Sequence, residues 1–212
     1  MPLIFQKDHK EFGCKIAVWE NTEDDDFFMQ RLVLNDQEDA YLNKLRENRR
    51  QEWMCSRVVL KILLNADYIP LRKDEYGKPI IENSDYHISI SHSQNRAAII
   101  ASKKLVGIDI QEDVAKIDRI HHKFISEKEL KKIDTGQKHK SYHMFWGAKE
   151  AMYKAYGKKS LNFNNHMKLY PFKYFNDQLE LKGQLNKNGL TQDYNIFSHK
   201  LDNFYLVYAV LE

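Results

Sequence analysis

The sequence has little cysteine and none of the common glycine-rich phosphate loops. Its two cysteines, Cys14 and Cys55, form neither a metal-binding pair nor a disulfide framework. The patterns GxxxxGKS/T, GxGxxG and GxSxG are absent, which excludes the usual nucleotide-binding loops and the nucleophile elbow. A phosphate-bearing ligand would therefore have to be held by side chains and a metal ion.

Long apolar runs are missing as well. No run approaches the roughly 18 apolar residues that cross a membrane, and residues 1–8 lack the apolar region of a signal peptide. Together with the few thiols, these absences predict a soluble, cytoplasmic protein that does not bind membranes. The net charge of +3 is too small to indicate nucleic acid, although it suits an acidic partner.

The chain does have the composition of a folded protein, with 42% hydrophobic residues, 12 Tyr and 11 Phe. Each half combines a long helical pattern, over residues 36–64 and 138–157, with several alternating runs typical of strands. We therefore expect an α+β fold of two similar lobes, residues 1–104 and 105–212, each with a long helix on a small, mainly antiparallel sheet.

The predicted helix over residues 138–157 has a charged face and an apolar face. At roughly 100° per residue, Trp146, Glu150 and Lys154 lie one above another, while an apolar stripe occupies the other side. Gly157 is a natural end for this helix. A Glu four residues before a Lys is also a common surface pair, so the pattern alone leaves that interpretation open.

A second acidic segment lies upstream, in the predicted strand over residues 105–110. Alternation places Asp109 and Gln111 on one face and the neighbouring isoleucines in the core. A carboxylate and an amide oxygen, joined by Glu150 from the helix, would suit Mg²⁺, which takes one or two carboxylates and completes its shell with phosphate and water. The alternative is that Asp109 is an ordinary carboxylate at the end of a strand.

Phosphate ligands are predicted nearby. Lys78 follows a glycine turn, and Ser91 and His92 end the strand predicted over residues 87–92. A single histidine is more often structural, so that alternative also stays open. The other histidines, such as His121 and His122, show no metal-ligand spacing with Cys or Glu, and we expect no zinc site.

Five segments taken in order resemble a known family. They are Gly77-Lys78-Pro79, Ser89-Ile90-Ser91-His92-Ser93, Val106-Gly107-Ile108-Asp109-Ile110, Phe124-Ile125-Ser126-Glu127-Lys128-Glu129 and Trp146-Gly147-Ala148-Lys149-Glu150-Ala151. In this order and spacing the chain resembles the 4′-phosphopantetheinyl transferases of the surfactin-synthetase-activating (Sfp) type.

The resemblance implies a pseudo-twofold α+β fold that binds coenzyme A in a cleft between two lobes. Such enzymes transfer phosphopantetheine to a serine of an acyl or peptidyl carrier protein, usually an acidic protein, and release 3′,5′-adenosine bisphosphate. Two lobes in one chain need no second subunit to form the cleft, so we expect a monomer.

The resemblance also implies roles for single residues. Asp109, Glu150 and Gln111 would ligate Mg²⁺, Lys154 would stabilise the leaving group, and Glu129 would shape the metal site. Five further residues would hold coenzyme A: Lys78, Ser91 and His92, with Arg50 and Lys73 as looser candidates.

The sequence departs from the family pattern at Gln111, where many members have Glu. The amide oxygen can ligate Mg²⁺ but adds no negative charge. This leaves open a second hypothesis, that the chain binds coenzyme A or a carrier protein but is catalytically weakened. A basic RNA- or protein-binding module is a third, supported only by Arg49 and Arg50.

Overall fold

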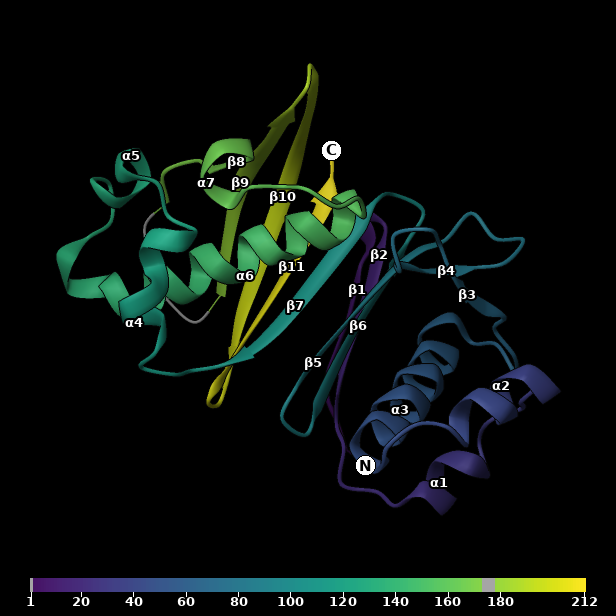
Figure 1. The fold of residues 1–212 in the computed structure, drawn as a ribbon. Helices are drawn as coiled ribbons and strands as arrows, with labels where there is room; N and C mark the ends of the chain where they lie inside the picture. Colours follow the sequence, from purple (N-terminus) through teal and green to yellow (C-terminus); the bar gives the residue numbers. More distant parts are fainter. Residues whose placement is uncertain (1, 173–177) are drawn as a thin grey trace.

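The computed structural model describes residues 2–172 and 178–212, and it is an α+β structure built on two antiparallel sheets (Figure 1). The first sheet has the order β1-β2-β6-β5-β4-β3 and the second β7-β11-β10-β9-β8. The strands are β1 Leu3–His9, β2 Cys14–Glu20, β3 Leu71–Lys73, β4 Pro79–Ile81, β5 His87–Ser93, β6 Arg96–Ser102, β7 Val106–Glu112, β8 Met167–Leu169, β9 Gln178–Lys187, β10 Leu190–Leu201 and β11 Phe204–Leu211.

Each sheet has one long helix on its outer face. Helix α3, Glu47–Leu64, packs on β2 and β6, and α6, Lys138–Tyr156, lies across β7 and β11, as Figure 1 shows. One apolar cluster lies between each long helix and its sheet. A third joins the two sheets and includes Ile16, Ile100, Ile108 and Tyr208. Strand β7 is therefore held between the first sheet and α6.

The remaining helices are short. They are α1 Asp25–Met29, α2 Asp36–Leu42, α4 Ile117–Ile120, α5 Glu127–Leu130 and α7 Phe163–His166, with 3-10 turns at Lys10–Phe12, His121–Lys123 and Thr135–Gln137. Local sequence signals explain several ends. Gly157 adopts a left-handed conformation and closes α6, and Asn188-Gly189, both with positive φ, form the turn of the β9–β10 hairpin.

One predicted helix was too long. The helix expected over residues 36–64 is broken between α2 and α3, where the Arg50 side chain donates to the Leu42 carbonyl and to Asn43 Oδ1. These bonds satisfy polar groups at the end of α2, so the break is stable. Ser126 and Glu129 form a capping box at the start of α5, which ends at Leu130.

The two cysteines are free and buried. Among the described residues, no helix is both long and apolar enough to cross a membrane. The division into lobes 1–104 and 105–212 falls between β6 and β7; the pseudo-twofold relation of the two halves stays a prediction.

Candidate active site

Strand β7 places Asp109 against α6, on the face opposite the sheet–sheet core. Ile108 and Ile110 point into that core, as alternation predicts. The strand lies at the edge of its sheet, and its backbone is completed from β5: the Ile108 and Ile110 N–H groups donate to the hydroxyls of Ser89 and Ser91. These serines therefore hold the strand that bears Asp109 in a fixed position.

Glycines allow β7 and β11 to approach α6 closely. A Cβ atom at Gly107 would lie 1.9 Å from the Ala151 carbonyl oxygen and 2.6 Å from the Ala155 nitrogen. At Gly147 it would lie 2.6 Å from Val207 Cγ2. Only a residue without a side chain fits at these two contacts, so the glycines set the distance between Asp109 and the helix.

The helix brings Glu150 into the electric field of Asp109. Glu150 is half-buried, and burial together with the Asp109 charge raises its pKa to about 7, against the opposing effect of Lys154. Two interacting carboxylates at a largely buried position cost free energy until a cation joins them. We call Asp109 and Glu150 the acid pair.

Lys154 lies beside the acid pair and is fully engaged. Its Nζ donates to Asp109 Oδ1 at 2.9 Å, to Ser91 Oγ at 2.9 Å and to the Ile108 carbonyl at 2.9 Å. The Ser91 hydroxyl in turn donates to Asp109 Oδ1 at 3.1 Å. The structure thus brings together four of the predicted site residues, Ser91, Asp109, Glu150 and Lys154.

The acid pair has oxygens available for a cation. Asp109 Oδ2 is buried and has no hydrogen-bond partner, and the Glu150 carboxylate has no hydrogen bond among the described residues. An unpartnered buried carboxylate oxygen is costly and is usually explained by a missing ligand. Two carboxylates match the number that Mg²⁺ takes beside phosphate and water, so these residues fit the ion.

Gln111, the third predicted metal ligand, is bound to His143 instead. Its Nε2 donates to the His143 carbonyl at 3.0 Å, and its Oε1 accepts from His143 Nδ1 at 3.1 Å. Both ends of the amide are therefore occupied by one residue of α6. A role for Gln111 in binding Mg²⁺ stays a prediction that would require breaking this pair of bonds.

Glu129 belongs to a different buried cluster. Its carboxylate binds Lys149 Nζ at 2.8 Å, accepts from the Leu169 backbone N–H and closes the capping box with Ser126. Lys149 is fully buried, and burial lowers its pKa. None of the hydrogen bonds of Glu129 among the described residues joins it to the acid pair, so its contribution to a metal site can only be indirect.

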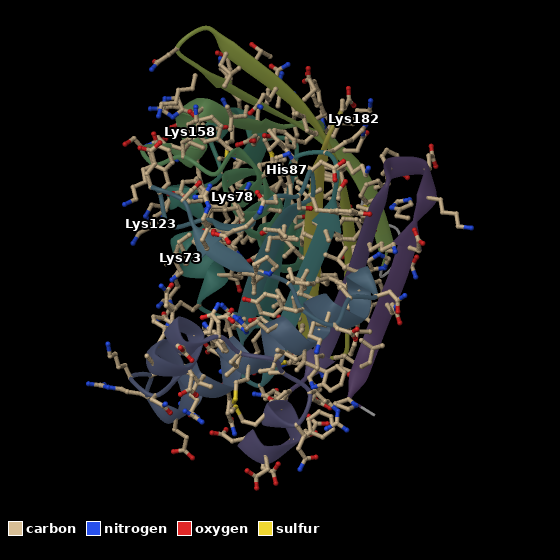
Figure 2. All side chains as sticks on the ribbon, turned by 90° about the vertical axis from the view of Figure 1, so that its right-hand side faces the viewer. Lys73, Lys78, His87, Lys123, Lys158 and Lys182 are labelled. Atoms are coloured by element: carbon tan, nitrogen blue, oxygen red, sulfur yellow. The ribbon has the colours of Figure 1, made fainter. Side chains whose placement is uncertain are left out.

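The predicted coenzyme A ligands lie toward the C-terminal end of α6. Lys78 Nζ donates to the Ala155 carbonyl at 2.9 Å, and burial lowers its pKa. Figure 2 shows Lys73, Lys78, His87 and Lys158 on one face of the molecule. Lys73 pairs with Pro79 in the β3–β4 hairpin, next to Lys78, and has an exposed side chain. Three lysine side chains, Lys73, Lys78 and Lys158, thus lie on this face.

His92 and Arg50 are placed differently. Burial, together with the smaller effects of Lys154 and Arg49, lowers the pKa of His92 to about 4 against the opposing effect of Glu52. The Arg50 guanidinium binds Asp25 at 2.6 Å as well as the end of α2. A phosphate contact from Arg50 would have to replace that ion pair.

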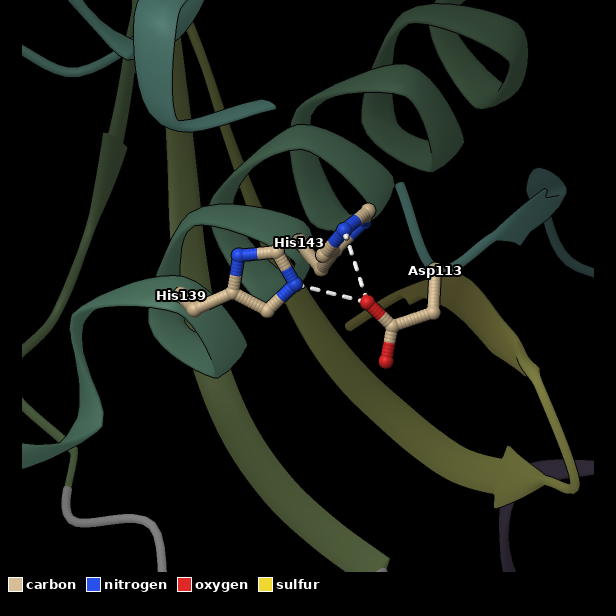
Figure 3. A group of neighbouring side chains, drawn as sticks. All are labelled: Asp113, His139 and His143. Atoms are coloured by element: carbon tan, nitrogen blue, oxygen red, sulfur yellow. Dashed lines mark hydrogen bonds and ion pairs between the residues drawn. The ribbon is translucent and has the colours of Figure 1, made fainter. Parts of the chain in front are cut away.

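The sequence analysis missed a cluster of Asp113, His139 and His143, which we call the His–Asp cluster (Figure 3). One ligand atom of each residue lies within 4.8 Å of the others. His139 and His143 are four residues apart on α6, and Asp113 follows β7. The helical i, i+4 spacing of the two histidines is the sequence signal for such a cluster.

A cavity of about 360 Å³ lies away from the acid pair. It is bordered by α5, the first half of α6 and the segment after β8, with Glu129, Ser141, Phe145 and Leu169 among its walls. The cleft expected between two lobes is thus not this cavity, because the residues around it all follow residue 128.

One known family is similar to the second half of the chain. A model of the 4′-phosphopantetheinyl transferase superfamily matches residues 105–206. That range contains β7 and α6, and with them the acid pair and Lys154. The match supports placing the chain among phosphopantetheinyl transferases. No curated protein matches the sequence.

Proposed function

We propose that the protein is a Mg²⁺-dependent 4′-phosphopantetheinyl transferase of the Sfp type. It transfers the phosphopantetheine group of coenzyme A to a serine of an acyl or peptidyl carrier protein. The observation that carries the proposal is the acid pair beside Lys154, drawn from β7 and α6 inside the range that the family model matches. The lysines Lys73 and Lys78, which lie on one face of the molecule, support binding of the phosphates of coenzyme A.

Asp109 and Glu150 would hold Mg²⁺, which when bound supplies Lewis-acid charge to the pyrophosphate. The carrier serine oxygen forms a bond to the phosphorus next to pantetheine while the bond from that phosphorus to the bridging oxygen breaks. Glu150, or a water that it positions, would accept the serine proton. Lys154 donates to the departing phosphate of 3′,5′-adenosine bisphosphate and stabilises its charge.

The other site residues support binding and position. Lys78, Ser91 and His92 contact the adenosine end of coenzyme A, with Lys73 and Arg50 at its edge. Glu129 acts as a positioning residue through its bond to Lys149, which precedes Glu150 on α6.

We also infer how the two halves of the chain are related. Residues 1–104 and 105–212 form two lobes related by a pseudo-twofold axis, with coenzyme A bound between them. One long helix on each sheet supports this relation. Because both lobes belong to one chain, we expect a monomer by light scattering, and a stable dimer would contradict that part of the proposal.

The transfer is tested by mass spectrometry of a carrier protein. The chain is incubated with coenzyme A, Mg²⁺ and an apo carrier protein, and the carrier should gain the mass of one phosphopantetheine group. Glu150→Gln and Asp109→Asn should each lower the rate by 100-fold or more, since each removes a charged ligand acting on the transition state. Glu112→Gln, in the same strand but bonded to exposed Asn203, serves as the control and should keep the activity.

A second candidate function is binding without efficient transfer, favoured by the engagement of Gln111 with His143. Coenzyme A binding by calorimetry with no mass gain on any carrier would support it. Absence of both binding and transfer would reject both functions.

A further inference from the structure

The His–Asp cluster stands at the other end of the same strand–helix pair, where the end of β7 meets the first half of α6. We propose that Asp113, His139 and His143 form a second metal site, which binds Zn²⁺ or a similar transition-metal ion through two imidazole nitrogens and one carboxylate oxygen. The inference is independent of the transferase reaction and of the Mg²⁺ site.

His143 is fully buried and is oriented by Gln111. Because Gln111 Oε1 can only accept, the ring proton must lie on Nδ1. The lone pair of Nε2 therefore faces the cluster, where it lies 3.5 Å from Asp113 Oδ1 and accepts a long bond of 3.3 Å from the Val114 N–H. A metal ion would take the place of that weak bond.

His139 has the same arrangement with a different partner. Its Nδ1 binds the carboxylate of Asp118 at 3.0 Å, and its Nε2 points at Asp113 Oδ1 at 2.6 Å. A histidine whose second nitrogen is held by a carboxylate is the usual outer arrangement around a metal-bound imidazole.

The Asp113 carboxylate is also held by a residue outside the cluster. Lys200 Nζ binds Asp113 Oδ2 at 2.6 Å, which leaves Oδ1 directed at the two histidines. All three candidate ligands thus have one atom facing the cluster and a different atom held by an outer residue. Such outer partners orient ligands before the metal arrives, and here they are complete.

The spacing suits a small ion with nitrogen ligands. Zn–N and Zn–O bonds of about 2.1 Å separate tetrahedral ligand atoms by roughly 3.4 Å, so shifts of about 1 Å would suffice. The observed separations from Asp113 Oδ1 are 2.6 Å and 3.5 Å. Two imidazoles favour zinc, copper or nickel over Mg²⁺, which prefers oxygen. Three protein ligands leave at least one position for water or an added group.

This site also explains why an amide occupies position 111. Gln111 donates to the His143 carbonyl and accepts from the His143 ring, and a carboxylate could perform only the second task. In this inference Gln111 is an outer partner of the His–Asp cluster and holds the histidine from which the metal bond is made.

The competing arrangement has a proton in place of the metal. Protonated His139 between Asp113 and Asp118 would balance both carboxylates, and the cluster would then be an ion-pair network. The two arrangements are separated by whether a metal binds and whether its affinity depends on His139.

The experiment uses the full chain freed of metal with a chelator and titrated with Co²⁺, whose visible absorption reports nitrogen ligation, followed by displacement with Zn²⁺. We expect one Co²⁺ per chain that excess Mg²⁺ does not displace. His139→Gln removes a half-exposed ligand and should weaken Co²⁺ and Zn²⁺ by at least 10-fold; Asp118→Asn, which removes only an outer partner, should weaken them by about 10- to 100-fold. His122→Gln, which changes an exposed histidine outside the cluster, should leave the titration unchanged.

Glu150→Gln separates this site from the acid pair, because it should abolish phosphopantetheine transfer and keep the Co²⁺ spectrum. The inference is overturned if Co²⁺ gives no ligation spectrum, if His139→Gln binds it as tightly as the unchanged protein, or if Glu150→Gln removes the site. His143→Gln is avoided as the main test because His143 is fully buried and its replacement can prevent folding.

Discussion

The negative charge of ionised Glu150 lowers the stability of the folded protein. Its pKa is raised from 4.5 to about 7, so between these pH values the folded state keeps a proton that the unfolded chain releases. The free energy of unfolding therefore falls as the pH rises through this interval. Residues at functional sites often lower the stability of the folded protein in this way.

Replacing this carboxylate should stabilise the protein in the absence of metal. We expect Glu150→Gln to raise the free energy of unfolding by about 1 to 3 kcal/mol at pH 8, with a much smaller gain at pH 4.5. Urea unfolding in a chelator at both pH values measures this. Glu127→Gln, an exposed glutamate in α5, should show no such pH-dependent gain, and an equal gain at both pH values would contradict the assignment.

Gln111 decides between the two candidate functions. In Gln111→Glu the carboxylate would meet the His143 carbonyl where the amide now donates at 3.0 Å, so the variant should lose about 1 to 3 kcal/mol of stability. If the released carboxylate turns to the acid pair, the Mg²⁺ concentration for half-maximal transfer should fall. Activity measured against Mg²⁺ gives this value, and a rise would show that position 111 does not face the metal.

The Asp109–Glu150–Lys154 grouping was predictable from the sequence because alternation and helical spacing each place side chains on known faces. The partners of single side chains were not predictable. Lys78 binds the end of α6 and Arg50 binds Asp25, and both contacts depend on loop paths that no local pattern determines.

The contact between β7 and α6 depends on Gly107. A Cβ atom there would meet backbone atoms of Ala151 and Ala155, which cannot turn aside. We expect Gly107→Ala to destabilise the protein by 1 to 3 kcal/mol or more and to lower transfer by separating Asp109 from Glu150. Gly136→Ala is the matched control, since the nearest atom would be 3.6 Å away. Chemical unfolding measures the stability of both variants, and equal stabilities would contradict this expectation.

Elements with strong local signals were predicted well. Helix α6 has its apolar stripe and Gly157, and β5 and β7 have alternation, so their predicted bounds agree closely with the structure. Strand β1 was not foreseen, because its alternating half-buried pattern reads as polar sequence. The break between α2 and α3 was missed because apolar periodicity continues across it while the backbone turns.

At the scale of the whole molecule, Lys78 connects the first sheet to the second half of the chain. Lys78→Met keeps the buried methylene chain but removes the bond to the Ala155 carbonyl, so we expect a loss of about 1 kcal/mol in stability. Thermal unfolding measures the loss. Lys73→Met, at an exposed position in the same hairpin, should leave the stability within about 0.5 kcal/mol. Equal effects of the two variants would show that the Ala155 contact contributes nothing.

The general architecture followed from the repetition of helix and strands in each half of the sequence. How the sheets meet did not, because the sheet–sheet cluster joins residues such as Ile16 and Tyr208 that are far apart in the chain. The i, i+4 spacing of His139 and His143 is visible in the sequence, but their meeting with Asp113 depends on how β7 and the start of α6 are placed together.

Lys154 has only three protons to donate, and Ser91, Ile108 and Asp109 already receive all of them. Lys154 can donate to an arriving phosphate only if it gives up one of these three acceptors. If the bond to Asp109 is given up, Asp109 Oδ1 is freed from Lys154 and can join Oδ2, which has no partner, in binding a cation. Coenzyme A and Mg²⁺ should then bind cooperatively, each with a higher affinity when the other is present.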